Sequence, residues 1–116
     1  KKLLHHVNRM NERASGMLER SLDALAQMDM EAAVGVIMED DELDEEFDAG
    51  MRHLVTFMWE NPGAITRVLD MVFVLKALER VGDHANHISK QVIFIAEGKD
   101  VRYVSPEILE SRFSKS

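Results

Sequence analysis

Two long stretches of this chain contain no proline, and the break between them, Asn61-Pro62-Gly63, constrains the fold more than any other feature. Asp29 is a good helix N-cap and follows an apolar run that ends at Met28, which predicts a second boundary there. Gly98 occupies the place of a glycine just beyond a helix C-terminus. Together these signals predict helices near residues 3–28, 30–60 and 64–97.

Helices of this length are roughly 40–50 Å long at about 1.5 Å per residue. Such helices are too long for a compact globule and are typical of an antiparallel bundle. No strand pattern competes with them, so the predicted fold class is all-α, an antiparallel three-helix bundle in one domain over residues 1–116. Ser105-Pro106-Glu107 has the N-cap, N1 and N2 residues of a helix start and predicts a short C-terminal turn over about 105–112.

The third predicted helix carries two series of residues at alternating steps of three and four, the spacing of bundle seams. The first series is apolar throughout: Met71, Val74, Leu78, Val81, Ala85, Ile88, Val92 and Ile95. The second is apolar at both ends and polar in the middle: Ile65, Val68, Val72, Leu75, Glu79, Gly82, Asn86, Ser89 and Ile93. Because two seams need partners on two sides, we expect part of one seam to pack against a second copy in a homodimer, or against another part of a longer chain.

The negative charge of the chain is local. Residues 39–48 hold eight of the 21 acids, and the remaining acids nearly balance the 14 Lys and Arg residues. No basic stripe is present to neutralise phosphates, which argues against nucleic acid as a partner. The chain has no cysteine, which excludes disulfides and thiolate metal sites.

No apolar run approaches the roughly 20 residues that a membrane span requires. The chain starts with Lys-Lys followed by an amphipathic pattern, without the apolar block of a signal peptide. Because it opens without methionine and already in helical rhythm, we expect it to be part of a longer protein.

Four carboxylates lie where apolar residues are expected. At about 100° per residue, Asp40 and Asp44 fall inside the apolar arc of the second helix. Glu79 interrupts a seam of the third helix, and Asp83 follows Glu79 at the same i,i+4 spacing. Residues 42 and 81 lie at similar distances from the break at 61–63, so antiparallel helices bring the two pairs to one height. We call these four residues the acidic site. The neighbouring glutamates are predicted to face solvent: Glu39, Glu42, Glu45 and Glu46.

Four carboxylates at one level repel each other unless they are protonated, bridged by cations or open to water. One interpretation is that Lys76, Arg80 and Lys90 pair with them. The other is a metal site with oxygen ligands, which suits Mg, Mn, Ca or iron. Asp41 on the flank is a further candidate ligand, and so is His87, which stands at i,i+4 from Asp83. A ferritin-like di-iron site is less favoured, because its Glu-x-x-His pair is absent.

The residues around the acidic site resemble the PhoU family of phosphate-transport regulatory proteins. The resemblance rests on Ala-Leu-Glu-Arg-Val-Gly-Asp-His-Ala at 77–85, on Val-Ile-Phe-Ile-Ala-Glu-Gly-Lys-Asp-Val-Arg at 92–102, and on Asp-Asp-Glu-Leu-Asp at 40–44. It implies a protein of two tandem three-helix repeats, each with a Glu/Asp-x-x-x-Asp motif that can bind multinuclear metal clusters. The ending at 98–102 is similar to that of the second repeat.

What the resemblance implies is regulation and not catalysis. Such proteins are cytoplasmic, act between a phosphate ABC transporter and a sensor histidine kinase, and keep the phosphate-starvation response off when phosphate is plentiful. By position, the four carboxylates of the acidic site would be the metal ligands, for iron, Mg, Mn or Zn. Two residues depart from the family pattern: His87 replaces a usual Asn, and Lys90 replaces a frequent Glu, which lowers the negative charge near the site.

Two other classes of function stay open. A carboxylate-bridged metalloenzyme would need open coordination positions and an organised general base, for which the chain offers only His84 or His87 near the site. A purely structural helical interaction domain would be indifferent to metal.

Overall fold

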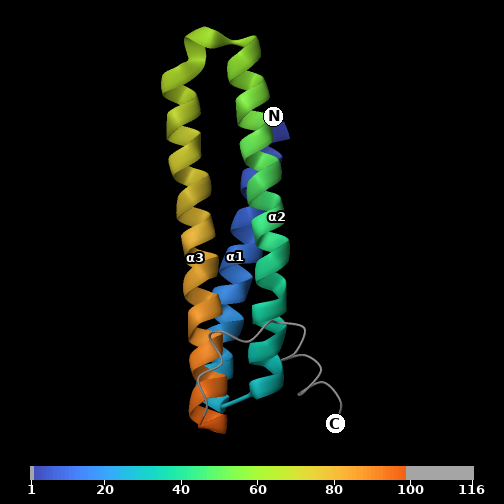
Figure 1. The fold of residues 1–116 in the computed structure, drawn as a ribbon, viewed down its shortest axis with the longest axis vertical. Coiled ribbons are helices and arrows are strands. Elements are labelled where there is room, and N and C mark those ends of the chain that lie inside the picture. Colours follow the sequence, from blue (N-terminus) through green and yellow to red (C-terminus); the bar gives the residue numbers. More distant parts are fainter. Residues whose placement is uncertain (1, 99–116) are drawn as a thin grey trace.

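The structure is a computed structural model that describes residues 2–98. Three long helices of the described residues pack against one another, and Figure 1 shows the hairpin of the last two extending past the start of the first. The elements are α1 (Lys2–Gln27), α2 (Met30–Glu60), the short 3₁₀ helix η1 (Pro62–Ala64) and α3 (Ile65–Glu97). Each helix is antiparallel to the next in the chain. The predicted all-α three-helix bundle is therefore confirmed, and the helix ends lie within one residue of those expected.

Local chemistry accounts for the helix ends. The Asp29 side chain accepts a hydrogen bond from the Ala32 amide at 3.1 Å and caps α2, as predicted. Gly98 adopts the left-handed conformation, with φ 73°, and its amide donates to the Phe94 carbonyl at 2.7 Å. Met28 also has a positive φ, 52°, in the turn between α1 and α2. The turn expected over about 105–112 lies outside the described residues.

The core follows the whole length of the bundle. Of the two series on α3, the second is the more deeply buried, with Val68, Leu75, Gly82, Ser89 and Ile93 all inside. In the first series, Val74 and the last member, Ile95, are exposed, at 39% and 58%. Part of that seam is thus open in this bundle. No helix within residues 2–98 combines the length and apolar character that crossing a membrane requires.

Two glycines let α2 and α3 approach closely. A Cβ atom placed on Gly50 would lie 3.1 Å from Cδ1 of Leu75, and one placed on Gly82 would overlap Cδ2 of Leu43. Each glycine thus leaves room for a leucine of the facing helix. The second of these contacts lies at the level of the acidic site.

Candidate functional site

The packing of α2 against α3 sets the register of the acidic site. Leu43, fully buried on α2, packs against Gly82 of α3. Nearby, the side-chain Nδ2 of Asn86 donates to Oδ2 of Asp40 at 3.4 Å. These two contacts place residues 40–43 opposite 82–86. The register expected from the distances to the break at 61–63 is therefore observed.

Asp40 is the most perturbed carboxyl of the acidic site. Burial, followed by the negative charges of Asp44, Asp83 and Asp41, raises its pKa from 3.8 to about 7, and Lys90 opposes the shift. Its Oδ1 atom is buried and has no hydrogen-bond partner among the described residues. Asp40 therefore carries a proton or a nearby cation more readily than an ordinary aspartate does.

Asp44 lies one turn further along α2 and is exposed. Partial burial of its carboxyl and then the charges of Glu79, Asp83 and Asp41 raise its pKa above the ordinary value. Asp83 acts on both aspartates of α2, and Glu79 acts on Asp44. The structure thus joins all four predicted carboxylates into one electrostatically coupled group that spans two helices.

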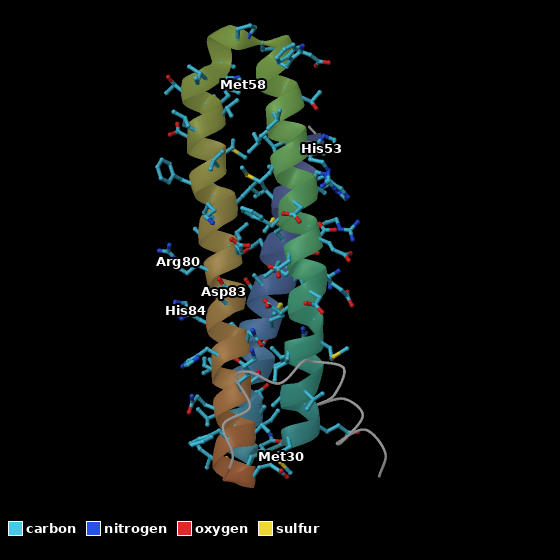
Figure 2. All side chains as sticks on the ribbon, in the orientation of Figure 1. Met30, His53, Met58, Arg80, Asp83 and His84 are labelled. Atoms are coloured by element: carbon cyan, nitrogen blue, oxygen red, sulfur yellow. The ribbon has the colours of Figure 1, made fainter. Side chains whose placement is uncertain are left out.

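Basic side chains offset part of this charge. Lys76 Nζ lies 3.4 Å from Glu79 Oε1 on the same helix, and Lys90 lowers the pKa of Asp40. Figure 2 shows Arg80 and His84 pointing away from the bundle on the outer side of α3. Two of the three cations in the ion-pair interpretation therefore act on the acidic site, and Arg80 points elsewhere.

The two further candidates differ in their surroundings. Asp41 is exposed and its charge raises the pKa of both Asp40 and Asp44. His87 is exposed on α3 and is not among the principal charges that act on those two aspartates. Its role as a ligand stays a prediction.

The donor chemistry of the acidic site fits a hard cation, because it consists of carboxylate oxygens, one of which is buried without a partner. The side chains as they lie do not yet converge: within residues 2–98, no group of three His, Asp or Glu side chains is arranged to hold a metal ion. The acidic site is thus a group of electrostatically coupled carboxylates, and side-chain rotation would have to bring them together around a bound ion.

The prediction that four glutamates face solvent was wrong for two of them. Glu39 and Glu46 are partly buried against α1. Nη1 of Arg13 lies 3.2 Å from Glu39 Oε2 and 2.7 Å from Glu42 Oε1, and Arg20 also pairs with Glu39. Arg9 pairs with Glu46 at 3.3 Å. Part of the acidic run therefore ties α2 to α1. The sequence signal for this contact is the row of arginines on one face of α1: Arg9, Arg13 and Arg20.

Sequence reasoning also missed the neutral residues that build the acidic site. Asn86 was assigned to a seam only for its spacing, yet it holds Asp40. Leu43 was not singled out, although it is fully buried between the two aspartates of α2. The sequence did contain a signal for the contact. Leu43 lies between two acids of α2, and Gly82 lies between two acids of α3 at the same predicted level.

Comparison with known proteins gives consistent matches over most of the chain. Residues 7–92, which include all four carboxylates, match the PhoU domain family. The Pseudomonas aeruginosa protein named "Phosphate-specific transport system accessory protein PhoU homolog" is 40% identical over 98 residues, covering 84% of this chain and 40% of the relative. The Escherichia coli K12 accessory protein PhoU is 32% identical over 108 residues, covering 93% and 45%.

Among solved structures, the crystal structure of PhoU from Pseudomonas aeruginosa matches with a TM-score of 0.76 and 38% identity, covering 79% of this chain and 44% of that one. The chain thus spans less than half the length of each of these relatives. Sequence and fold agree over the part that contains the acidic site, and the chain belongs to the PhoU domain family.

Proposed function

We propose that this chain is part of a regulatory accessory protein of phosphate uptake, which links a phosphate ABC transporter to a sensor histidine kinase in the cytoplasm. The observation that carries the proposal is the 40% identity, over 84% of the chain, to a relative named as an accessory protein of phosphate-specific transport. The role is regulatory and not catalytic. In support, one of the two histidines that a metalloenzyme would use as a base, His84, points away from the bundle.

The acidic site is proposed to bind a metal ion, with Asp40, Asp44, Glu79 and Asp83 as ligands. The raised pKa values of the two aspartates on α2 support this, because they show carboxylates held together at a cost that a cation would offset. A bound iron, Mg, Mn or Zn ion would supply positive charge on an acidic surface. That surface would then accept a phosphate group, which the bare carboxylates repel.

We further propose that the open part of α3 makes helix-packing contacts in a homodimer or with the rest of a longer chain. The exposed Val74 and Ile95 of its apolar seam, together with Phe73 at 73% exposure, support this. Light scattering on the purified chain tests the dimer. A monodisperse monomer would leave only the second kind of partner.

The metal proposal is tested by stripping the protein with chelator and adding Mg, Mn, Fe and Zn separately while following the melting temperature. We expect one metal to raise the melting temperature of the parent and not that of Asp40→Asn/Glu79→Gln. A matched control, Glu45→Gln/Glu60→Gln, neutralises two exposed acids outside the acidic site and should respond as the parent does. An equal response of all three proteins would contradict the proposed ligands.

The regulatory proposal is tested in a bacterial host that lacks its own PhoU and carries a reporter of the phosphate-starvation response. Expression of the full protein should keep the reporter off at high phosphate, and the Asp40→Asn/Glu79→Gln variant should leave it on. A reporter that stays on with the parent protein, at normal expression, would exclude the proposed role in that host.

A further inference from the structure

Gly82 stands between the two carboxylates of α3, and Leu43 stands between the two of α2. The two residues are both buried and face each other across the interface. A Cβ atom on Gly82 would overlap Cδ2 of Leu43, would lie 3.5 Å from its Cγ, and would lie 3.7 Å from Oδ1 of Asp40. The side chain of Leu43 thus fills the volume that a side chain at position 82 would occupy.

Leu43 has little freedom to move aside. It is 0% exposed and belongs to the main core cluster with Met10 and Ala14 of α1. Protein interiors are close-packed, so an added methyl group is accommodated by shifts of the backbone or by strained rotamers. A methyl group at position 82 would therefore push α2 and α3 apart at the level of the acidic site.

We infer that Gly82 is the positioning residue of the acidic site: by leaving room for Leu43, it sets the α2–α3 separation at which carboxylates of both helices can share one cation. The inference rests on the proposed metal function. Its physical basis is the short metal–oxygen distance. Oxygen ligands to the proposed metals lie about 2.0–2.6 Å from the ion, so carboxylates on two helices can share an ion only within a narrow range of helix separations. Gly82 itself contributes no ligand atom, so its effect is indirect.

The chain supplies its own control. Gly50 makes the same kind of contact from α2, where a Cβ would lie 3.1 Å from Cδ1 of Leu75. It lies in the interface of the same two helices but further along the bundle, toward η1. A substitution there strains the α2–α3 packing without acting at the level of the four carboxylates.

The experiment is a calorimetric titration of the full chain with Mn²⁺ for five proteins: the parent, Gly82→Ala, Gly50→Ala, Leu43→Ala and Gly82→Ala/Leu43→Ala. Circular dichroism first establishes a temperature at which all are folded. We expect Gly82→Ala to weaken Mn²⁺ binding by roughly 10–100-fold, the range seen when groups that orient metal ligands are changed. Gly50→Ala should bind within about twofold of the parent, as expected for a distant, independent site.

Removal of the leucine side chain relieves the overlap, so Gly82→Ala/Leu43→Ala should recover most of the lost affinity. This rescue separates positioning from general destabilisation, because the double variant has lost the buried Leu43 side chain that Gly82→Ala alone keeps. If Gly82→Ala alone does not fold, the double variant is the test. A folded double variant that binds Mn²⁺ with nearly the affinity of the parent supports the inference, and a folded double variant that binds Mn²⁺ weakly overturns it.

The remaining outcomes are distinct. If Gly82→Ala binds Mn²⁺ as the parent does, the positioning role is wrong and the metal proposal stands. If Gly50→Ala loses as much affinity as Gly82→Ala, general loosening of the bundle is the cause and the inference is wrong. If the parent binds no Mn²⁺, the metal proposal fails for this ion and the positioning role falls with it.

Discussion

The side-chain amide of Asn86 donates to Oδ2 of Asp40 at 3.4 Å, so a neutral residue of α3 holds the most perturbed carboxyl of α2. Oδ1 of Asp40 and Oδ1 of Asn86 are both buried without a hydrogen-bond partner among the described residues. Because these two buried oxygens accept no hydrogen bond, binding of a cation or of a proton next to them is favourable. The repulsion from the neighbouring carboxylates acts in the same direction.

Asp40 makes the stability of the chain depend on pH. Its pKa in the folded protein, about 7, lies above the ordinary value of 3.8, so folding takes up a proton between these values and stability falls as the pH rises from about 4 to about 7. At pH 8 without metal, Asp40→Asn should therefore be more stable than the parent. The gain should be at most about 2 kcal/mol, because the carboxyl is only partly buried and water screens its charge.

Urea unfolding at pH 8 and pH 4, in chelator, measures this difference. At pH 4 the parent carboxyl is mostly protonated when folded, and the gain should nearly vanish. Glu45→Gln, which neutralises an exposed acid of the same helix, is the control for general charge relief. An equal gain from Asp40→Asn at both pH values would contradict the assignment of the effect to this titration.

Asn86→Asp should act in opposite directions with and without metal. The substitution removes the donor to Asp40 and adds a fifth carboxylate, which should destabilise the metal-free chain by about 1–3 kcal/mol. With a hard cation bound, the added negative oxygen should tighten binding. Melting curves in chelator and in excess Mn²⁺ measure both effects. His84→Asp, which adds the same charge at an exposed position of α3 that points away from the bundle, should show less of each.

Much of this architecture could be predicted from the sequence, because its signals are local. Asp29 and Gly98 have side-chain and backbone properties that end helices wherever they occur. The i,i+4 spacing of Glu79 and Asp83, with the distances to the break at 61–63, was enough to predict which levels of α2 and α3 meet, because helix rise is constant.

The partners of individual side chains could not be predicted in the same way. Glu39 was assigned to solvent because periodicity compares a residue only with its own helix, and the arginines that pair with it lie on α1. The overlap between Leu43 and a side chain at position 82 depends on the separation of two helices, which no sequence period specifies. Such contacts are properties of the packed pair of helices and appear only in three dimensions.

Arg13 is expected to stabilise the α1–α2 interface. One of its nitrogens lies 3.2 Å from Glu39 and 2.7 Å from Glu42, and its side chain is 22% exposed. Arg13→Met keeps the aliphatic volume and removes the charge, and should cost about 1 kcal/mol at low salt. In 1 M salt the loss should be smaller, since the screening length falls to about 3 Å.

Chemical unfolding at the two salt concentrations measures this effect. Arg67→Met is the control, because it removes an exposed cation of α3, a change of at most about 0.5 kcal/mol at an ordinary surface position. A loss for Arg13→Met no larger than that of Arg67→Met would mean that the pairs between α1 and α2 contribute little to holding the helices together.

Glycine-to-alanine substitutions should have opposite effects at two other positions. Gly35 lies exposed within α2, and nothing lies within 4 Å of a Cβ placed there, so Gly35→Ala should stabilise the chain by about 0.5–1 kcal/mol. Gly98 has a φ of 73°, which costs an L-residue roughly 1–2 kcal/mol, so Gly98→Ala should destabilise. Thermal melts of both variants test the signs. A destabilising Gly35→Ala would indicate that α2 bends or packs against a partner there. Otherwise its gain is the intrinsic helix preference, which must be subtracted before the stability of Gly82→Ala is assigned to Leu43.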